Sequence, residues 1–87
     1  MKNFEELFAE LSAKKASQDP NSGTVKALEK GKHFIGKKIV EEAAEVWMAC
    51  EYETKDEAAE EISQLIYHLQ TMMLACDMDL DDVYKFL

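Results

Sequence analysis

Residues 37–47 read KKIVEEAAEVW, and this stretch decides the fold of the chain. Its apolar side chains recur at the three- and four-residue steps of an amphipathic helix: Ile39, Ala43, Val46 and Cys50. At about 100° per residue these side chains lie within about 60° of one another, so we expect them to form the buried face of the helix. Glu42 falls on the shoulder of that face, where a partly desolvated carboxylate requires a cation. Glu42 is therefore a candidate metal ligand, although an acidic helix also places a carboxylate at its core edge by chance.

The composition favours helices along the whole chain, because its 87 residues include only three glycines and one proline. The formal net charge of −8 argues against a nucleic-acid partner, since phosphates bind clustered Lys and Arg. No apolar run approaches the roughly 20 residues of a membrane span, and no signal peptide opens the chain. We therefore expect a cytoplasmic protein with no membrane partner, in which Cys50 and Cys76 are reduced core residues.

We expect an all-α fold, residues 1–87 as one domain, built on two long antiparallel helices with short flanking helices. The long helices are predicted at about 33–52 and 57–76, and the short connection between them makes them antiparallel neighbours. The flanking helices are predicted to begin at the caps Asn3, Thr24 and Asp79. One short N-terminal helix cannot cover both apolar stripes, so we expect a homodimer with a four-helix-bundle-like core.

The second long helix carries a polar stripe along one edge of its apolar face, formed by Glu57, Glu61, Gln64 and His68. In an antiparallel pair, Glu42 and Glu45 of the first helix can face Glu61 and Gln64. Three carboxylates and an amide oxygen suit a hard divalent cation such as Mg²⁺ or Mn²⁺. The plainer interpretation is that these are solvated charges, with His68 a hydrogen-bonded boundary residue. A di-iron site is excluded because it needs Glu-x-x-His pairs.

The sequence resembles the phosphoribosyl-ATP pyrophosphatase family of all-α nucleoside-triphosphate pyrophosphohydrolases. The resemblance covers nearly the whole chain and depends on these segments: SGTVKAL at 22–28, Gly31, Lys38-x-x-Glu41-Glu42-x-x-Glu45, Glu61-x-x-Gln64-Leu65-Ile66-Tyr67-His68, and LDDVY at 80–84. One position departs, because the superfamily pattern has Asp where this chain has Gln64. An amide oxygen can coordinate Mg²⁺ without contributing charge, so either three carboxylates hold the metal or Glu57 or Glu60 shares the task.

The resemblance implies hydrolysis of phosphoribosyl-ATP to phosphoribosyl-AMP and pyrophosphate, the second step of histidine biosynthesis. It implies Mg²⁺ (or Mn²⁺) as the cofactor, with Glu42, Glu45, Glu61 and Gln64 as ligands. Glu41 would join Glu42, Glu45 and Glu61 as a catalytic carboxylate that orients water or a second metal. The expected substrate-binding residues are Lys38, Ser22 and Thr24, although helix capping explains Thr24 equally well.

Two alternatives remain open at this point. A house-cleaning nucleoside-triphosphate pyrophosphohydrolase would share the metal site and differ in the base it accepts. A helical dimerisation module without chemistry would carry the same apolar stripes, and its carboxylates would bind no metal.

Overall fold

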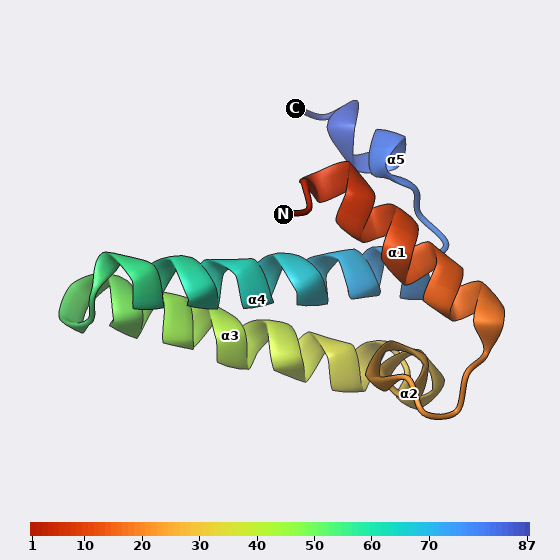
Figure 1. The fold of residues 1–87 in the computed structure, drawn as a ribbon, viewed down its shortest axis with the longest axis horizontal. Helices are drawn as coiled ribbons and strands as arrows, with labels where there is room; N and C mark the ends of the chain where they lie inside the picture. The colour runs from red at the N-terminus through yellow and green to blue at the C-terminus, as the bar shows by residue number, and fades with distance from the viewer.

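The computed structural model describes residues 1–87 and consists of helices joined by short connections (Figure 1). The helices, in chain order, are α1 (Phe4–Ser17), α2 (Gly23–Lys30), α3 (Lys32–Tyr52), α4 (Lys55–Ala75) and α5 (Leu80–Tyr84). The long helices α3 and α4 run antiparallel and form the largest helix–helix contact of the chain. The predicted all-α fold is therefore confirmed. None of the helices combines the length and the apolar character that a membrane crossing requires.

Side-chain caps fix most of the helix starts, as the sequence predicts. Asn3 and Glu6 form a reciprocal capping box, and Asp79 opens α5 with the same motif. Thr54 accepts a hydrogen bond of 3.2 Å from the backbone N–H of Glu57 at the start of α4. Thr24 as the cap of α2 is wrong: Ser22 is the cap, and it accepts a hydrogen bond from the N–H of Val25.

Gly31 separates α2 from α3 and sets the sharp change of direction between them. Its φ of 96° lies in a region that side chains with a Cβ rarely adopt. Its N–H still donates to the carbonyl of Ala27, so the last turn of α2 closes before the chain bends. This bend carries the start of α3 alongside the C-terminal half of α4 (Figure 1).

The core lies at one end of the α3–α4 pair, where α1 and α2 cross it (Figure 1). The buried apolar side chains there are Leu11, Val25, Ile35, Met73 and Leu74, and Ala49 is buried separately, near the C-terminal end of α3. The other end of the pair, near the turn between α3 and α4, extends beyond the remaining helices. The carboxylates singled out in the sequence lie in this less covered half.

The face that α3 turns toward α4 differs from the predicted one. Ala49 is fully buried and Glu42 and Val46 are half-buried, whereas Ala43 and Cys50 are exposed. At about 100° per residue, the observed face is centred near Glu42, about 60° around the helix from the predicted stripe. The prediction that Ala43 and Cys50 are buried within the chain is therefore wrong, because α3 has apolar residues on two faces and α4 covers only one.

The cysteines are both free thiols. Cys76 is half-buried at the end of α4, as an apolar helix position predicts, but Cys50 is exposed on α3. The expectation that both are core residues is wrong for Cys50, because it belongs to the face of α3 that α4 leaves uncovered.

Candidate metal centre

Three carboxylates from the two long helices converge on one point. Glu42 and Glu45 come from α3 and Glu61 from α4, and one oxygen of each lies within 4.8 Å of the other two. Glu42 faces α4, Glu45 lies about one turn further along α3, and the antiparallel course of α4 brings Glu61 opposite both. The structure thus gathers three of the four residues predicted as metal ligands, which we call the carboxylate cluster.

The three carboxylates of the cluster lie so close together that their negative charges repel one another, and hydrogen bonds within the protein do not offset this repulsion. Hydrogen bonding with Glu42, loss of hydration and the neighbouring Glu45 raise the pKa of Glu61 from 4.5 to about 7. Oε2 of Glu42 is buried and has no hydrogen-bond partner in the protein. A divalent cation would offset this negative charge. It would replace the proton that Glu61 shares with Glu42, and it would bind the unpartnered Oε2 of Glu42. The all-oxygen donor set fits a hard cation such as Mg²⁺.

The acidic surface continues from the cluster toward the turn between α3 and α4. A hydrogen bond with Glu57, loss of hydration and the charges of Glu61 and Glu45 raise the pKa of Glu53 above its usual value. Glu57 and Glu60, the neighbours considered as a fourth ligand, are exposed and lie outside the cluster. This end of the helix pair therefore disfavours a phosphate group unless a cation lies between them.

Gln64, Glu41 and Lys38 lie beside the cluster rather than in it. Gln64 is exposed about one turn beyond Glu61 on α4, so its role as a ligand stays a prediction. Glu41 is exposed on α3, and its Oε2 lies 3.5 Å from Nζ of the half-buried Lys38. Lys38 thus pairs with a carboxylate outside the cluster, and its contact with phosphate also stays a prediction.

Ser22 and Thr24 use their hydroxyls inside the protein. The Ser22 hydroxyl caps α2 through a 3.3 Å hydrogen bond from the N–H of Val25. Thr24 is only 3 % exposed, and its Oγ1 lies 2.7 Å from the hydroxyl of Tyr67 on α4. These bonds fix the N-terminus of α2 against α4, and the expected substrate contacts of Ser22 and Thr24 stay predictions.

The sequence reasoning missed Tyr67 as the residue that anchors α2. Its hydroxyl reaches Thr24 from a segment 43 residues away. The signal was present, because Tyr67 lies in the Leu65-Ile66-Tyr67-His68 segment, but periodicity alone does not reveal a hydrogen bond between distant helices.

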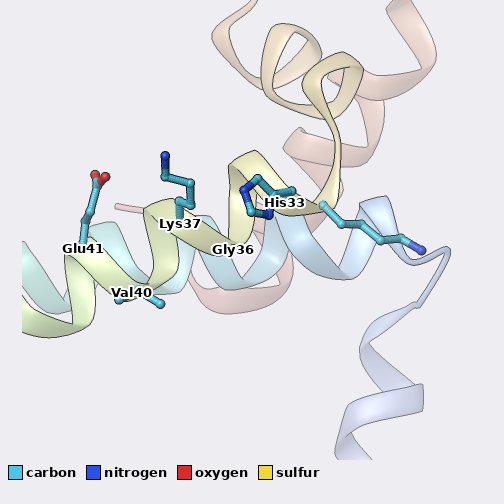
Figure 2. A pocket seen from close by; sticks show the side chains of 6 residues that line it. His33, Gly36, Lys37, Val40 and Glu41 are labelled. Atoms are coloured by element: carbon cyan, nitrogen blue, oxygen red, sulfur yellow. The ribbon is translucent and has the colours of Figure 1, made fainter.

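A separate shallow hollow lies on the outer surface of the N-terminal half of α3 and has a volume of about 590 Å³. Its lining residues are Lys32, His33, Gly36, Lys37, Val40 and Glu41. Figure 2 shows Lys37 and Glu41 directed to the same side of the helix, and Val40 lines the same hollow between them in the sequence. The hollow contains no residue of the carboxylate cluster, which is the group of converging candidate metal ligands in the chain.

The comparisons with known proteins agree with this geometry. The profile of the family described as "Phosphoribosyl-ATP pyrophosphohydrolase" matches residues 1–87. The chain is similar to a "Phosphoribosyl-ATP pyrophosphatase" of Salinibacter ruber, with 66 % identity over 87 residues that cover 100 % of both chains. It is 64 % identical over 87 residues to the protein of the same name from Streptomyces coelicolor, covering 99 % of this chain and 97 % of that one. A third relative of that name, from Bifidobacterium animalis subsp. lactis, is 64 % identical over 85 residues, 98 % of each chain.

Proposed function

Because the chain belongs to the phosphoribosyl-ATP pyrophosphohydrolase family, we propose that it hydrolyses phosphoribosyl-ATP to phosphoribosyl-AMP and pyrophosphate. This hydrolase reaction is the second step of histidine biosynthesis. The observation that carries the proposal is the convergence of Glu42, Glu45 and Glu61 within 4.8 Å. A negatively charged protein needs such a group of ligands to bring a triphosphate close, because a divalent cation can then stand between the carboxylates and the phosphates.

We propose that the cluster holds Mg²⁺, with Mn²⁺ as a replacement of similar ligand preference. When bound, the cation neutralises charge that develops on the pyrophosphate leaving group and lowers the pKa of the attacking water. The raised pKa of Glu61 and the unpartnered Oε2 of Glu42 support this assignment. Gln64 is the proposed neutral fourth ligand, one turn from Glu61 on α4.

The other residues would position the substrate and water around the cation. Glu41 lies beside the cluster with its carboxylate exposed, where it can orient the attacking water. The Lys38 ammonium, now paired with Glu41 at 3.5 Å, can exchange that partner for a phosphate oxygen. Ser22 and Thr24 hold the N-terminus of α2, whose free N–H groups favour an anion.

The direct test incubates the purified protein with phosphoribosyl-ATP and Mg²⁺ and identifies the products by mass spectrometry. We expect equal amounts of phosphoribosyl-AMP and pyrophosphate, with loss of activity on chelation and in Glu61→Gln. Release of inorganic phosphate instead, or no release of pyrophosphate, would refute the proposal. A panel of nucleoside triphosphates distinguishes the house-cleaning alternative, which predicts faster hydrolysis of a simple nucleotide than of phosphoribosyl-ATP.

We also propose that the protein is a homodimer, because apolar side chains along both long helices remain exposed. Val40 and Trp47 of α3 are 70 % and 68 % exposed, and Ile62 and Leu69 of α4 are 42 % and 43 % exposed. A second α3–α4 pair would cover these side chains in a four-helix core. Light scattering at low micromolar concentration should give twice the chain mass, and a stable folded monomer would contradict the proposal.

We place the enzyme in the cytoplasm. Its exposed Cys50 is a free thiol, and such thiols persist in a reducing compartment. Fractionation of cells that produce the tagged protein should recover it with cytoplasmic markers, and recovery with a secreted fraction would contradict this assignment.

A further inference from the structure

Lys38 and His68 lie at matching levels of the antiparallel helix pair. Lys38 is seven residues before Glu45 on α3, and His68 is seven residues after Glu61 on α4. Seven residues are about two helical turns, or about 10 Å. Lys38 therefore lies on the same face of α3 as Glu45, and His68 lies on the same face of α4 as Glu61. Because Glu45 and Glu61 meet in the carboxylate cluster, Lys38 and His68 lie on matching faces of the two helices, on the same side of the cluster and about 10 Å from it. We call the edge of the α3–α4 pair that carries Lys38, Glu45, Glu61 and His68 the polar edge.

The electrostatic environment of His68 agrees with this position. Burial lowers the pKa of His68, the charge of Lys38 lowers it further, and Glu41 acts in the opposite direction. The charges of Lys38 and Glu41 thus both act on the imidazole from the neighbouring helix. On its own helix, His68 packs against the edge of the Tyr67 ring, at 5.1 Å between centroids. The imidazole is thus largely neutral near pH 7 and offers an N–H donor without a second buried charge.

The polar edge has opposite charges at its two ends. Beyond the cluster toward the α3–α4 turn lie Glu53 and Glu57, whose shared hydrogen bond raises the pKa of Glu53. In the other direction lie two ammonium groups close to the ring of Phe34: Lys30 is 4.5 Å and Lys38 is 5.6 Å from its ring centroid. An extended polyanion that reaches out from the cluster is therefore repelled at one end and attracted at the other.

We infer that Lys38 and His68 form the subsite that holds the distal phosphate of the leaving pyrophosphate. The inference rests on the proposed function and extends it by assigning a direction to the substrate along the polar edge. The Lys38 ammonium already has an exposed acidic partner that a phosphate can replace, because it pairs at 3.5 Å with Glu41, which lies between Lys38 and Glu45 in the sequence of α3. His68 donates a hydrogen bond from α4 to a phosphate oxygen, so the phosphate is bound by one side chain from each helix.

The test measures binding of pyrophosphate in the presence of Mg²⁺ by titration calorimetry, with His68→Ala and His68→Gln as variants. His33→Ala is the matched control, because His33 is the other histidine of the chain and lies in the hollow on the outer surface of α3 (Figure 2). We expect His68→Ala to weaken pyrophosphate binding about tenfold, the usual effect of losing one hydrogen bond to a charged group. His68→Gln keeps an N–H donor and should bind within about threefold of the wild type, and His33→Ala should match the wild type.

Binding of phosphoribosyl-AMP separates the two possible directions of the substrate. We expect this product to bind His68→Ala and the wild type equally, whereas weaker binding of phosphoribosyl-AMP alone would overturn the inference. Equal binding of pyrophosphate to all variants, or none to the wild type, would also overturn it. The inference would likewise be overturned if neither His68→Ala nor His68→Gln folded, or if both variants lost the same amount of pyrophosphate binding. If the wild type releases no pyrophosphate from phosphoribosyl-ATP, the proposed function itself is refuted. If the enzyme is active but its pyrophosphate binding does not depend on His68, only the inference about the subsite is overturned.

Discussion

Replacing Glu61 by Gln should remove most of the stabilisation that Mg²⁺ gives the protein. Glu61 completes the three-carboxylate cluster, so its loss removes a charged ligand while keeping the size of the side chain. The matched control is Glu60→Gln, which makes the same chemical change at the next residue, on an exposed part of α4 outside the cluster. Both variants are compared with the wild type at pH 8, at equal protein concentration, with Mg²⁺ and with a chelator.

The expected size of the effect follows from ligand linkage. A cation present at ten times its Kd stabilises the folded chain by about 1.4 kcal/mol. For 87 residues, an unfolding entropy of about 2.1 cal/mol/K per residue converts this free energy into a rise in Tm of about 8 °C. We expect this rise in the wild type and in Glu60→Gln, and a rise of less than about 2 °C in Glu61→Gln at the same Mg²⁺ concentration.

Without metal, the wild type should have no advantage in Tm over Glu61→Gln. Glu42 and Glu45 raise the pKa of Glu61 to about 7, so the ionised Glu61 opposes folding at pH 8. In chelator, Glu61→Gln should therefore melt no lower than the wild type. An equal rise in Tm for both variants on adding Mg²⁺ would show that the cation binds elsewhere, and the reasoning would then fail.

Three further predictions follow from the structure. In chelator, the Tm of the wild type relative to that of Glu61→Gln should fall as the pH rises from about 4.5 to above about 7. The reason is that the folded protein holds the Glu61 proton more tightly than the unfolded chain. A Tm difference that stays constant across a pH series would refute the raised pKa of Glu61. Tyr67→Phe leaves the buried Thr24 hydroxyl without its partner and should lower the free energy of unfolding by about 1–2 kcal/mol in denaturant titrations. Adding Thr24→Val should then cost little more, and full additivity would argue against the bond. Ala43→Glu puts a charge on the uncovered face of α3 and should give monomers in light scattering, whereas an intact dimer would place the interface elsewhere.

Local sequence signals were sufficient to place the helices. Asn3 and Asp79 each carry a side chain that can accept a hydrogen bond at a helix start, and the structure confirms both as caps. The start of α2 was harder, because Ser22 and Thr24 both carry hydroxyls two residues apart. The distant Tyr67 decides between them, since it engages Thr24 and leaves Ser22 to cap the helix.

The orientation of α3 could not be predicted from its apolar pattern. Ala43 and Cys50 belong to the most regular apolar stripe, yet α4 packs on the neighbouring face that contains Glu42 and Ala49. Periodicity identifies that a face will be buried but does not say whether a helix of the same chain or a second copy covers it.

The carboxylate cluster was predictable because its spacing is short-range on each helix. Glu42 and Glu45 lie on adjacent turns, and the short α3–α4 connection fixes the register that brings Glu61 to them. The same reasoning did not resolve Gln64, which is exposed beside the cluster. The contribution of a neutral ligand depends on how far its side chain turns toward the cation, and the sequence carries no signal for that.

The central claim is that Glu42, Glu45 and Glu61 hold the catalytic cation. A crystal of the protein grown with Mn²⁺ tests it most directly, because anomalous scattering locates manganese independently of the protein atoms. We predict a peak bound by oxygens of all three carboxylates, and loss of that peak in Glu61→Gln but not in Glu60→Gln. A peak confined to other acidic residues, such as Glu53 and Glu57 near the α3–α4 turn, would contradict the account.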